Sequence, residues 1–234
     1  MKKIISILQP GYLPWSGFFE QLHRSDVFVL YDDVQYTKND WRNRNRIKTA
    51  QGVKWLTVPV RSKSSFLIKD VSIDGTQWQR KHIKTITQNY SKAPFFEHYS
   101  VELFDLLKRS WKFLVDLNFA LIKWFAEKLE ILTPIKLSSD LNIVGSKVAR
   151  LIKIIHKFDG NRFYEGFSGK NYIDEEVFKR KSISIVFQDY ACFEYPQLFG
   201  PFVPFLSVLD LLFNCGRKSL EYIIKGSKDV KSVF

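Results

Sequence analysis

The sequence is poor in cysteine and histidine. Its 234 residues include two cysteines and four histidines. Two cysteines are too few for a disulfide framework, and together with four histidines they are too few for most Cys/His zinc sites. We therefore expect a protein of a reducing, cytoplasmic compartment without a Cys/His metal centre.

Long apolar runs are also missing. The apolar stretch of residues 3–8 stops at Gln9-Pro10-Gly11, which is too early for a secretion signal. No other stretch reaches the roughly 18 uncharged apolar residues that a membrane span needs. We expect no integral membrane contact.

Acidic residues are outnumbered, with 24 Asp and Glu against 36 Lys and Arg, a formal net charge of +12. Hydrophobic residues make up 45% of the chain and aromatic residues 16%, so the charge does not indicate disorder. The length fits one domain over residues 1–234. The excess of positive charge indicates a polyanionic, phosphorylated or membrane-surface partner.

Hydrophobic patterning predicts alternating strands and helices. A strand at 3–8, a helix around 18–23 and a strand at 26–31 form a β-loop-α-β unit, which normally closes into a parallel sheet. We expect an α/β layered fold, with a helical insertion around 76–130. The further strands are expected at 53–60, 162–166 and 183–188, and the further helices at 76–90, 100–129 (one or two helices), 145–157, 174–181 and 207–214.

The common phosphate-binding and hydrolase motifs are absent: the chain has no GxGxxG, no Walker A pattern and no GxSxG elbow. The loop of residues 9–17 nevertheless lies between the first strand and the first helix, where backbone N–H groups and the helix dipole favour an anion. Its candidate binding residues are Gln9, Gly11, Tyr12, Trp15 and Gly17. The alternative is a tight turn in which Trp15 packs inward.

Two aspartates follow the second strand, at the edge where α/β proteins place ligand-handling groups. Asp32 or Asp33 could act as a base or hold a hydrated Mg²⁺. Adjacent strand residues point to opposite faces, so we expect one of them in a site. A helix cap or a turn paired with nearby arginines is the alternative.

The segment of residues 41–48 is basic and aromatic. Arg42, Arg44 and Arg46 alternate, so in an extended segment they share one face, with Asn43 and Asn45 on the other. Guanidinium groups bind phosphate bidentately, and the pattern therefore predicts a phosphate clamp. A solvated charged face is the alternative.

A histidine on the expected helix at 76–90 is a candidate for proton transfer. His82 shares a helix face with Trp78 and lies beside Lys81. It could act as a general acid or base, or bind phosphate. A buried structural histidine is the alternative.

Several longer motifs together resemble the WbqC-like family, and the resemblance covers residues 4 to about 220. Members occur in bacterial gene clusters for O-antigen, lipopolysaccharide or capsule, and some are described as glycine or aminoacyl transferases acting on amino sugars. In the family pattern a His-Pro pair precedes Tyr-Pro-Gln, whereas here Ala191-Cys192-Phe193-Glu194 precedes Tyr195-Pro196-Gln197, so any role of that histidine is absent at this position. The motifs are residues 9–19, 31–36, 41–48, 78–82, 168–172 and 207–216.

This resemblance adds candidate binding residues in the second half of the chain. They are Ser168, Gly169, Lys170, Tyr172 and Asp210. In our functional hypothesis, Lys170 assists the three arginines in binding a diphosphate.

The opening strand-loop-helix-strand unit is also similar to that of nucleotidylyltransferases, whose loop carries HxGH. This similarity implies a Rossmann-like three-layer core with additional helices. Here Trp15-Ser16-Gly17-Phe18 occupies the slot, so both histidines are replaced by aromatic residues. Their loss argues against nucleotidyl transfer by that mechanism, because those histidines stabilise charge on the transferring phosphates.

Taken together, the motifs predict transfer of an aminoacyl group, such as glycyl, or another acyl group to an amino sugar on a nucleotide carrier. His82, Asp32 or Asp33 would remove the proton from the amine. The sequence leaves open an aminoacyl-tRNA, an acyl carrier or an ATP-dependent donor, and any cofactor is unknown. The alternatives are a non-catalytic module that binds a nucleotide sugar or nucleic acid, and a nucleotidylyltransferase with a changed loop.

Overall fold

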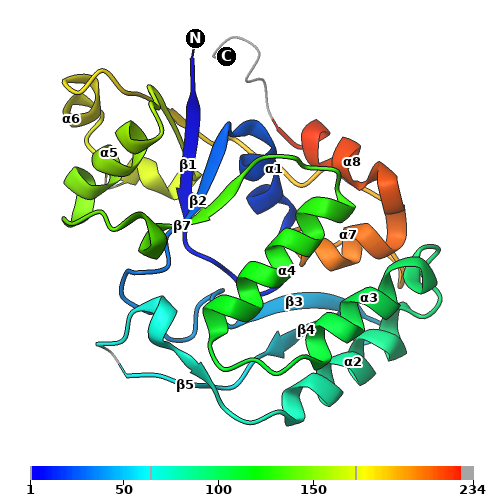
Figure 1. Cartoon of the computed structure of the whole chain (residues 1–234). Coiled ribbons are helices and arrows are strands. Elements are labelled where there is room, and N and C mark those ends of the chain that lie inside the picture. The colour runs from blue at the N-terminus through cyan, green and yellow to red at the C-terminus, as the bar shows by residue number, and fades with distance from the viewer. Residues whose placement is uncertain (1, 64, 172, 228–234) are drawn as a thin grey trace.

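A parallel β-sheet forms the framework of the computed structural model, which describes residues 2–63, 65–171 and 173–227. Within these residues the sheet has five strands in the order β7-β2-β1-β8-β9, and every neighbouring pair is parallel (Figure 1). This confirms the expected α/β class with a parallel sheet. The strands are β1 (Ile4–Leu8), β2 (Val27–Leu30), β7 (Ile135–Leu137), β8 (Arg162–Glu165) and β9 (Ser184–Phe187).

Strand β1 lies in the middle of the sheet because its residues are apolar on both faces. Ile5 pairs with Val27 of β2 on one side and with Phe163 of β8 on the other. All three side chains are buried. Strands covered on both faces carry continuous apolar runs rather than alternating ones, which is why β1 and β2 could be predicted.

Helices cover both faces of the sheet. On one face, Ile5 and Val29 pack with Ile154 of α5 and Phe178 of α6. On the other face, residues of β2 pack with α1 and α4 in a second, larger cluster. The expected three-layer, Rossmann-like arrangement is therefore confirmed. These helices are α1 (Ser16–Arg24), α4 (Leu114–Lys128), α5 (Lys147–Lys157) and α6 (Glu175–Lys179).

Of the helical segment after the first strands, α4 covers one face of the sheet, and α2 and α3 extend the helical layer beyond it. The pattern at 100–129 divides into α3 and α4, which pack with α2 and α7 in the larger cluster. Figure 1 shows α4 running diagonally across the middle of the molecule, below the labelled strands of the sheet, with α2 and α3 at the lower right. The remaining helices are α2 (Gln77–Tyr90), α3 (Phe96–Lys108), α7 (Val208–Cys215) and α8 (Ser219–Lys225).

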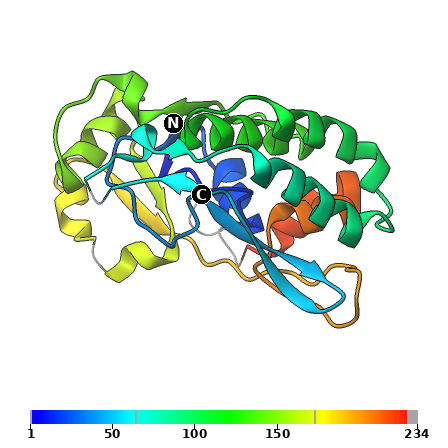
Figure 2. The same ribbon diagram turned by 90° about the horizontal axis from the view of Figure 1, so that it is seen from below.

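An antiparallel hairpin, β3 (Arg44–Thr49) and β4 (Gly52–Thr57), lies outside the parallel sheet. The strand predicted at 53–60 ends early at Thr57, and a separate short strand, β5 (Val60–Arg61), pairs with β6 (Ser72–Ile73). Pro59 explains the break, since proline cannot donate a ladder hydrogen bond. Figure 2 shows the hairpin projecting next to the loop that precedes α7.

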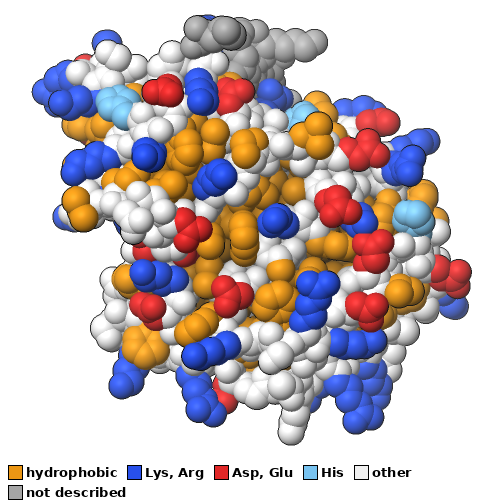
Figure 3. Space-filling model, viewed as in Figure 1, with side chains coloured by type: hydrophobic (Ala, Val, Ile, Leu, Met, Phe, Trp, Pro, Cys, Tyr) orange, Lys and Arg blue, Asp and Glu red, His pale blue; other side chains and the backbone are white. Residues whose placement is uncertain are grey.

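Basic and acidic side chains are intermixed on the visible surface of the protein. Figure 3 shows lysines and arginines interspersed with acidic side chains over one face, with hydrophobic side chains gathered near its centre. Among the described residues, no helix has both the length and the apolar character needed to cross a membrane.

Candidate functional site

A cavity of about 650 Å³ opens at the carboxyl edge of the parallel sheet. Leu8 at the end of β1, Tyr31 after β2 and Glu165 at the end of β8 all line it. The chain leaves β1 toward β2 on one side and returns to β8 on the other, so the strand order reverses at β1. In open α/β sheets this crevice is where ligands bind.

The loop after β1 forms one wall, through Gln9, Gly11, Pro14 and Trp15. Its backbone is held by Asn45 of the hairpin, whose Nδ2 donates to the carbonyl of Leu13 at 2.7 Å. Leu13 has a φ of 45°, a strained value for a leucine, and this contact holds it there. Since α1 begins directly after this wall, the positive end of its dipole is beside the cavity.

Two of the predicted arginines line the cavity. Arg42 Nε donates to Gln9 Oε1 at 2.5 Å, and its Nη2 lies 3.3 Å from an Asp40 carboxylate oxygen. Burial lowers the pKa of Arg42, although a guanidinium stays charged. Arg46 Nη2 donates to the carbonyl of Phe205 at 3.1 Å. The cavity therefore holds two fixed positive charges.

An acidic residue that was not predicted as a site residue, Glu165, lines the same cavity as these arginines. Burial raises the pKa of Glu165 to about 7, and a hydrogen bond from the backbone N–H of Gly166 offsets this only in part. A Cβ on Gly169 would lie 2.4 Å from Glu165 Cγ, so this glycine packs directly against the carboxylate side chain. A carboxyl group with a pKa near neutrality can both accept and donate a proton.

The two predicted aspartates lie at the same sheet edge but are engaged in hydrogen bonds outside the cavity lining. Asp32 is buried and accepts from Ser139 N at 2.9 Å and from Ser138 Oγ at 3.0 Å. Asp33 forms an ion pair with Arg150. Burial raises the pKa of Asp33, but hydrogen bonds from Arg150 and Ser138 outweigh it and lower the pKa overall.

His82 lies in a different hollow, a depression next to Lys81 and Trp78. Its Nε2 is 3.2 Å from the carbonyl of Thr57, which can only accept, so this nitrogen carries the proton. Its Nδ1 therefore accepts from the hydroxyl of Tyr12, at 2.8 Å. Burial lowers the pKa of His82 to about 4. The histidine is neutral and connects α2 to the loop after β1.

Arg44, Asn43 and Lys170 do not line the cavity. Arg44 lies over the Trp55 ring, 4.6 Å from its centroid, and Asn43 Nδ2 donates to Val58 O at 2.8 Å. Lys170 Nζ is 5.0 Å from the ring centroid of Phe167. Tyr172 lies outside the described residues.

Asp210, Ser168 and Gly169 also lie outside the cavity lining. Asp210 is buried and accepts from Tyr90 at 2.6 Å and Tyr195 at 2.9 Å. Ser168 lies with Gly169 in a 3₁₀ helix, Phe167–Asn171, that directly follows Glu165.

The aromatic residues in the HxGH slot also meet the cavity. Trp15 and Phe18 both line it, and a Cβ on Gly17 would lie 2.3 Å from the Trp15 ring. Cys192 is held nearby, 3.7 Å from Ser16 Oγ. Burial raises the pKa of Cys192, which disfavours its thiolate form.

Six predicted residues thus come together at one cavity: Gln9, Gly11, Trp15, Arg42, Asn45 and Arg46. Sequence reasoning missed Glu165, Tyr31 and Phe205 as lining residues. The available signal for Glu165 was its position at the end of an expected strand, followed by a glycine. Among the described residues, no group of three His, Cys, Asp or Glu side chains is arranged to hold a metal ion.

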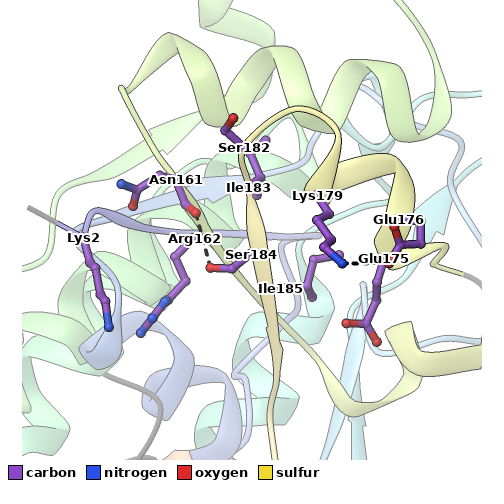
Figure 4. A pocket seen from close by; sticks show the side chains of 10 residues that line it. All are labelled: Lys2, Asn161, Arg162, Glu175, Glu176, Lys179, Ser182, Ile183, Ser184 and Ile185. Atoms are coloured by element: carbon purple, nitrogen blue, oxygen red, sulfur yellow. Dashed lines mark hydrogen bonds and ion pairs between the residues drawn. The ribbon is translucent and has the colours of Figure 1, made fainter.

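A second hollow, of about 590 Å³, lies at the opposite edge of the sheet, where β8 and β9 begin. Figure 4 shows its side chains, with Lys179 directed toward Glu176 and Ser184 toward Asn161. Lys179 and Glu176 are mostly exposed, with side-chain accessibilities of 77% and 68%. Solvent and salt screen these two exposed charges.

Comparison with known proteins identifies the family. The sequence model of the WbqC-like protein family matches residues 9–222. The chain is also 40% identical over 227 residues to the uncharacterized protein Rv1507c of Mycobacterium tuberculosis, covering 95% of this chain and 98% of that protein. No solved structure matches the chain. The chain belongs to the WbqC-like family, as its motifs predicted.

Proposed function

We propose that this protein transfers an aminoacyl or other acyl group to the amine of a nucleotide-linked amino sugar in surface-polysaccharide synthesis. The observation that carries the proposal is the common cavity of Arg42, Arg46 and Glu165. It combines two guanidinium groups, which suit a diphosphate, with a carboxylate whose pKa of about 7 suits a base.

The arginines and the start of α1 hold the phosphates in this proposal. Gln9 accepts from Arg42 Nε and Asp40 pairs with Arg42 Nη2, so the guanidinium is held in a fixed position at the cavity wall. Phosphate contacts of this kind orient the ligand, so that its sugar enters the cavity toward Glu165. Helix α1 has no acidic residue in its first turn to compete for the anion.

Glu165 acts as the general base. The amine nitrogen attacks the carbonyl carbon of the acyl donor, a C–N bond forms, and the bond to the donor's leaving group breaks. The amine proton passes to Glu165. A base of pKa about 7 is deprotonated in enough of the protein at neutral pH and takes up the proton readily.

The acyl donor is an activated ester or thioester, and an aminoacyl-tRNA is one candidate. The net charge of +12 supports a nucleic-acid donor, because neutralisation of phosphates dominates such binding. The amino acid carried would be small, such as glycine, as the family resemblance implies.

Binding of a nucleotide-linked amino sugar tests the phosphate site. We expect Arg42→Ala to weaken binding of a UDP-linked amino sugar about 10-fold to 100-fold by calorimetry, since hydrogen bonds to charged groups contribute about 1.5–3 kcal/mol. Arg61→Ala is the matched control: Arg61 is exposed on β5, paired with Asp74 at 2.8 Å. Equal effects of both substitutions, or no binding by the unchanged protein, would contradict the proposal.

A further inference from the structure

Two exposed tryptophans lie side by side at the β3–β4 hairpin, one on β4 and the other in the segment that precedes β3. Trp41 and Trp55 are each 43% accessible, and their ring centroids are 5.2 Å apart with an angle of 38° between the planes. Arg44 lies over the Trp55 ring at 4.6 Å. Arg46 lies 5.5 Å from the centroid of Trp41. We name these four residues the tryptophan platform.

The tryptophan platform is continuous with the cavity. Trp41 and Arg46 line the cavity, whereas Trp55 and Arg44 lie beyond its rim. Arg46 links the two parts, because its guanidinium is also 5.9 Å from the Trp55 ring. A ligand with phosphates at Arg42 and Arg46 therefore has an aromatic surface directly outside the cavity mouth.

The hairpin supports the tryptophan platform from below. Arg46 is opposite Trp55 in the ladder, and the residues next to each of them along its own strand point to the other face of the hairpin. There Asn45, Ile47 and Leu56 are buried in the protein. Near the carboxyl end of β3, the Lys48 ammonium donates hydrogen bonds to Gln197 Oε1 and to the carbonyl oxygens of Gly200 and Pro201. The exposed rings thus rest on a fixed base.

We propose that the tryptophan platform binds the nucleobase of a nucleoside diphosphate whose phosphates lie on Arg42 and Arg46. The inference rests on the proposed function and adds the position of the nucleoside, outside the cavity, with the sugar inside. Stacking of a base on an aromatic side chain contributes about 1–3 kcal/mol. The neighbouring guanidinium groups supply charge complementary to the phosphates.

The charge and the exposed rings together favour this occupant over a protein partner. Exposed aromatic groups that adjoin a cavity mark binding sites. In the described part of the chain, the Nε atoms of Arg44 and Arg46 have no hydrogen-bond partner although they are shielded from water. The positive charge of the Arg44 and Arg46 guanidinium groups beside the rings suits an anion better than an apolar protein surface.

Calorimetric titration of variants with UDP and with pyrophosphate tests this placement. We expect Trp55→Ala to weaken UDP binding about tenfold and to leave pyrophosphate binding unchanged, because pyrophosphate has no base to stack. Trp55→Phe should restore most of the UDP affinity. The matched control is Val53→Ala: Val53 is 44% exposed on the same face of β4, and its loss should change neither affinity.

The outcomes separate this inference from the proposed function. If the unchanged protein binds UDP and pyrophosphate but Trp55→Ala binds UDP as tightly, the placement of the base is overturned and the phosphate site stands. If the unchanged protein binds neither, both are overturned. Tighter binding of a short single-stranded RNA than of UDP, lost in Trp55→Ala, would overturn the assignment to a small nucleotide.

Discussion

Glu165 and His82 are both titratable groups withdrawn from water, but their surroundings differ. Burial raises the pKa of Glu165 to about 7 and lowers that of His82 to about 4, so both are held toward their neutral forms. His82 is hydrogen-bonded through both ring nitrogens, to Tyr12 and Thr57. Glu165 faces a cavity that also contains two arginines.

The difference shows why a residue type alone does not define a catalytic group. A histidine satisfied on both sides has no free nitrogen for a substrate, whereas a carboxyl group at a cavity wall can exchange a proton with one. Our proposal therefore gives proton transfer to Glu165 and gives His82 a positioning role, through Tyr12, for the loop after β1.

The largest expected effect is on catalysis. We expect Glu165→Gln to lower kcat for acyl transfer at least 100-fold, because general bases contribute about 10²–10⁴-fold, and to abolish the inflection of the rate near pH 7. His82→Gln should retain that inflection. Mass spectrometry of the acylated amino sugar over a pH series measures both.

The same assay can reverse the assignment. Glu176→Gln, in the hollow at the opposite sheet edge, is the control and should leave the rate unchanged. A full rate in Glu165→Gln together with a lost inflection in His82→Gln would transfer the role of base to the histidine.

A second effect concerns stability against pH. Between about pH 4.5 and 7 the folded protein keeps the Glu165 proton that the unfolded chain releases, so raising the pH through this window reduces stability. Between about pH 4 and 6.5 the unfolded chain protonates His82 and the folded protein does not, so lowering the pH reduces stability.

These two dependences oppose each other where they overlap. We expect stability to rise with pH in Glu165→Gln and to fall with pH in His82→Gln, each by on the order of 1 kcal/mol per pH unit relative to the unchanged protein. Urea unfolding at pH 5, 6 and 7 measures the slopes. Parallel slopes in the two variants would contradict the burial of one or both groups.

A smaller effect on catalysis than that of Glu165→Gln comes from crowding Glu165. A Cβ on Gly169 would lie 2.4 Å from Glu165 Cγ, whereas a Cβ on Gly166 would meet nothing within 4 Å. We expect Gly169→Ala to slow transfer about tenfold, at an overpacking cost of about 1–3 kcal/mol in stability, and Gly166→Ala to do neither. Equal rates in the two variants would show that the position of Glu165 is not critical.

Most of the parallel sheet was predictable because its strands are apolar on both faces and lie between turn residues. The hairpin was harder to predict from the sequence. Its two connecting residues, Ala50 and Gln51, are not the types preferred in a tight hairpin turn. The pairing of Arg46 with Trp55, which creates the tryptophan platform, therefore could not be recognised from the pattern.

The candidate site was predictable where chemistry and local position coincide. Gln9, Arg42 and Arg46 stood out because they lie in a loop after a strand or in an alternating basic segment, and all three line the cavity. Asp32 and Asp33 followed the same logic, but their hydrogen-bond partners, such as Ser138 and Arg150, come from a distant part of the chain.

The sequence by itself determined the layered α/β fold, the family and the two arginines of the cavity, since local hydrophobic pattern and residue chemistry are sufficient for these. Only the tertiary structure decided that Glu165 joins them and that His82 lies elsewhere. The physical reason is desolvation: the pKa of a group depends on which side chains the fold packs around it, and no local pattern encodes those neighbours.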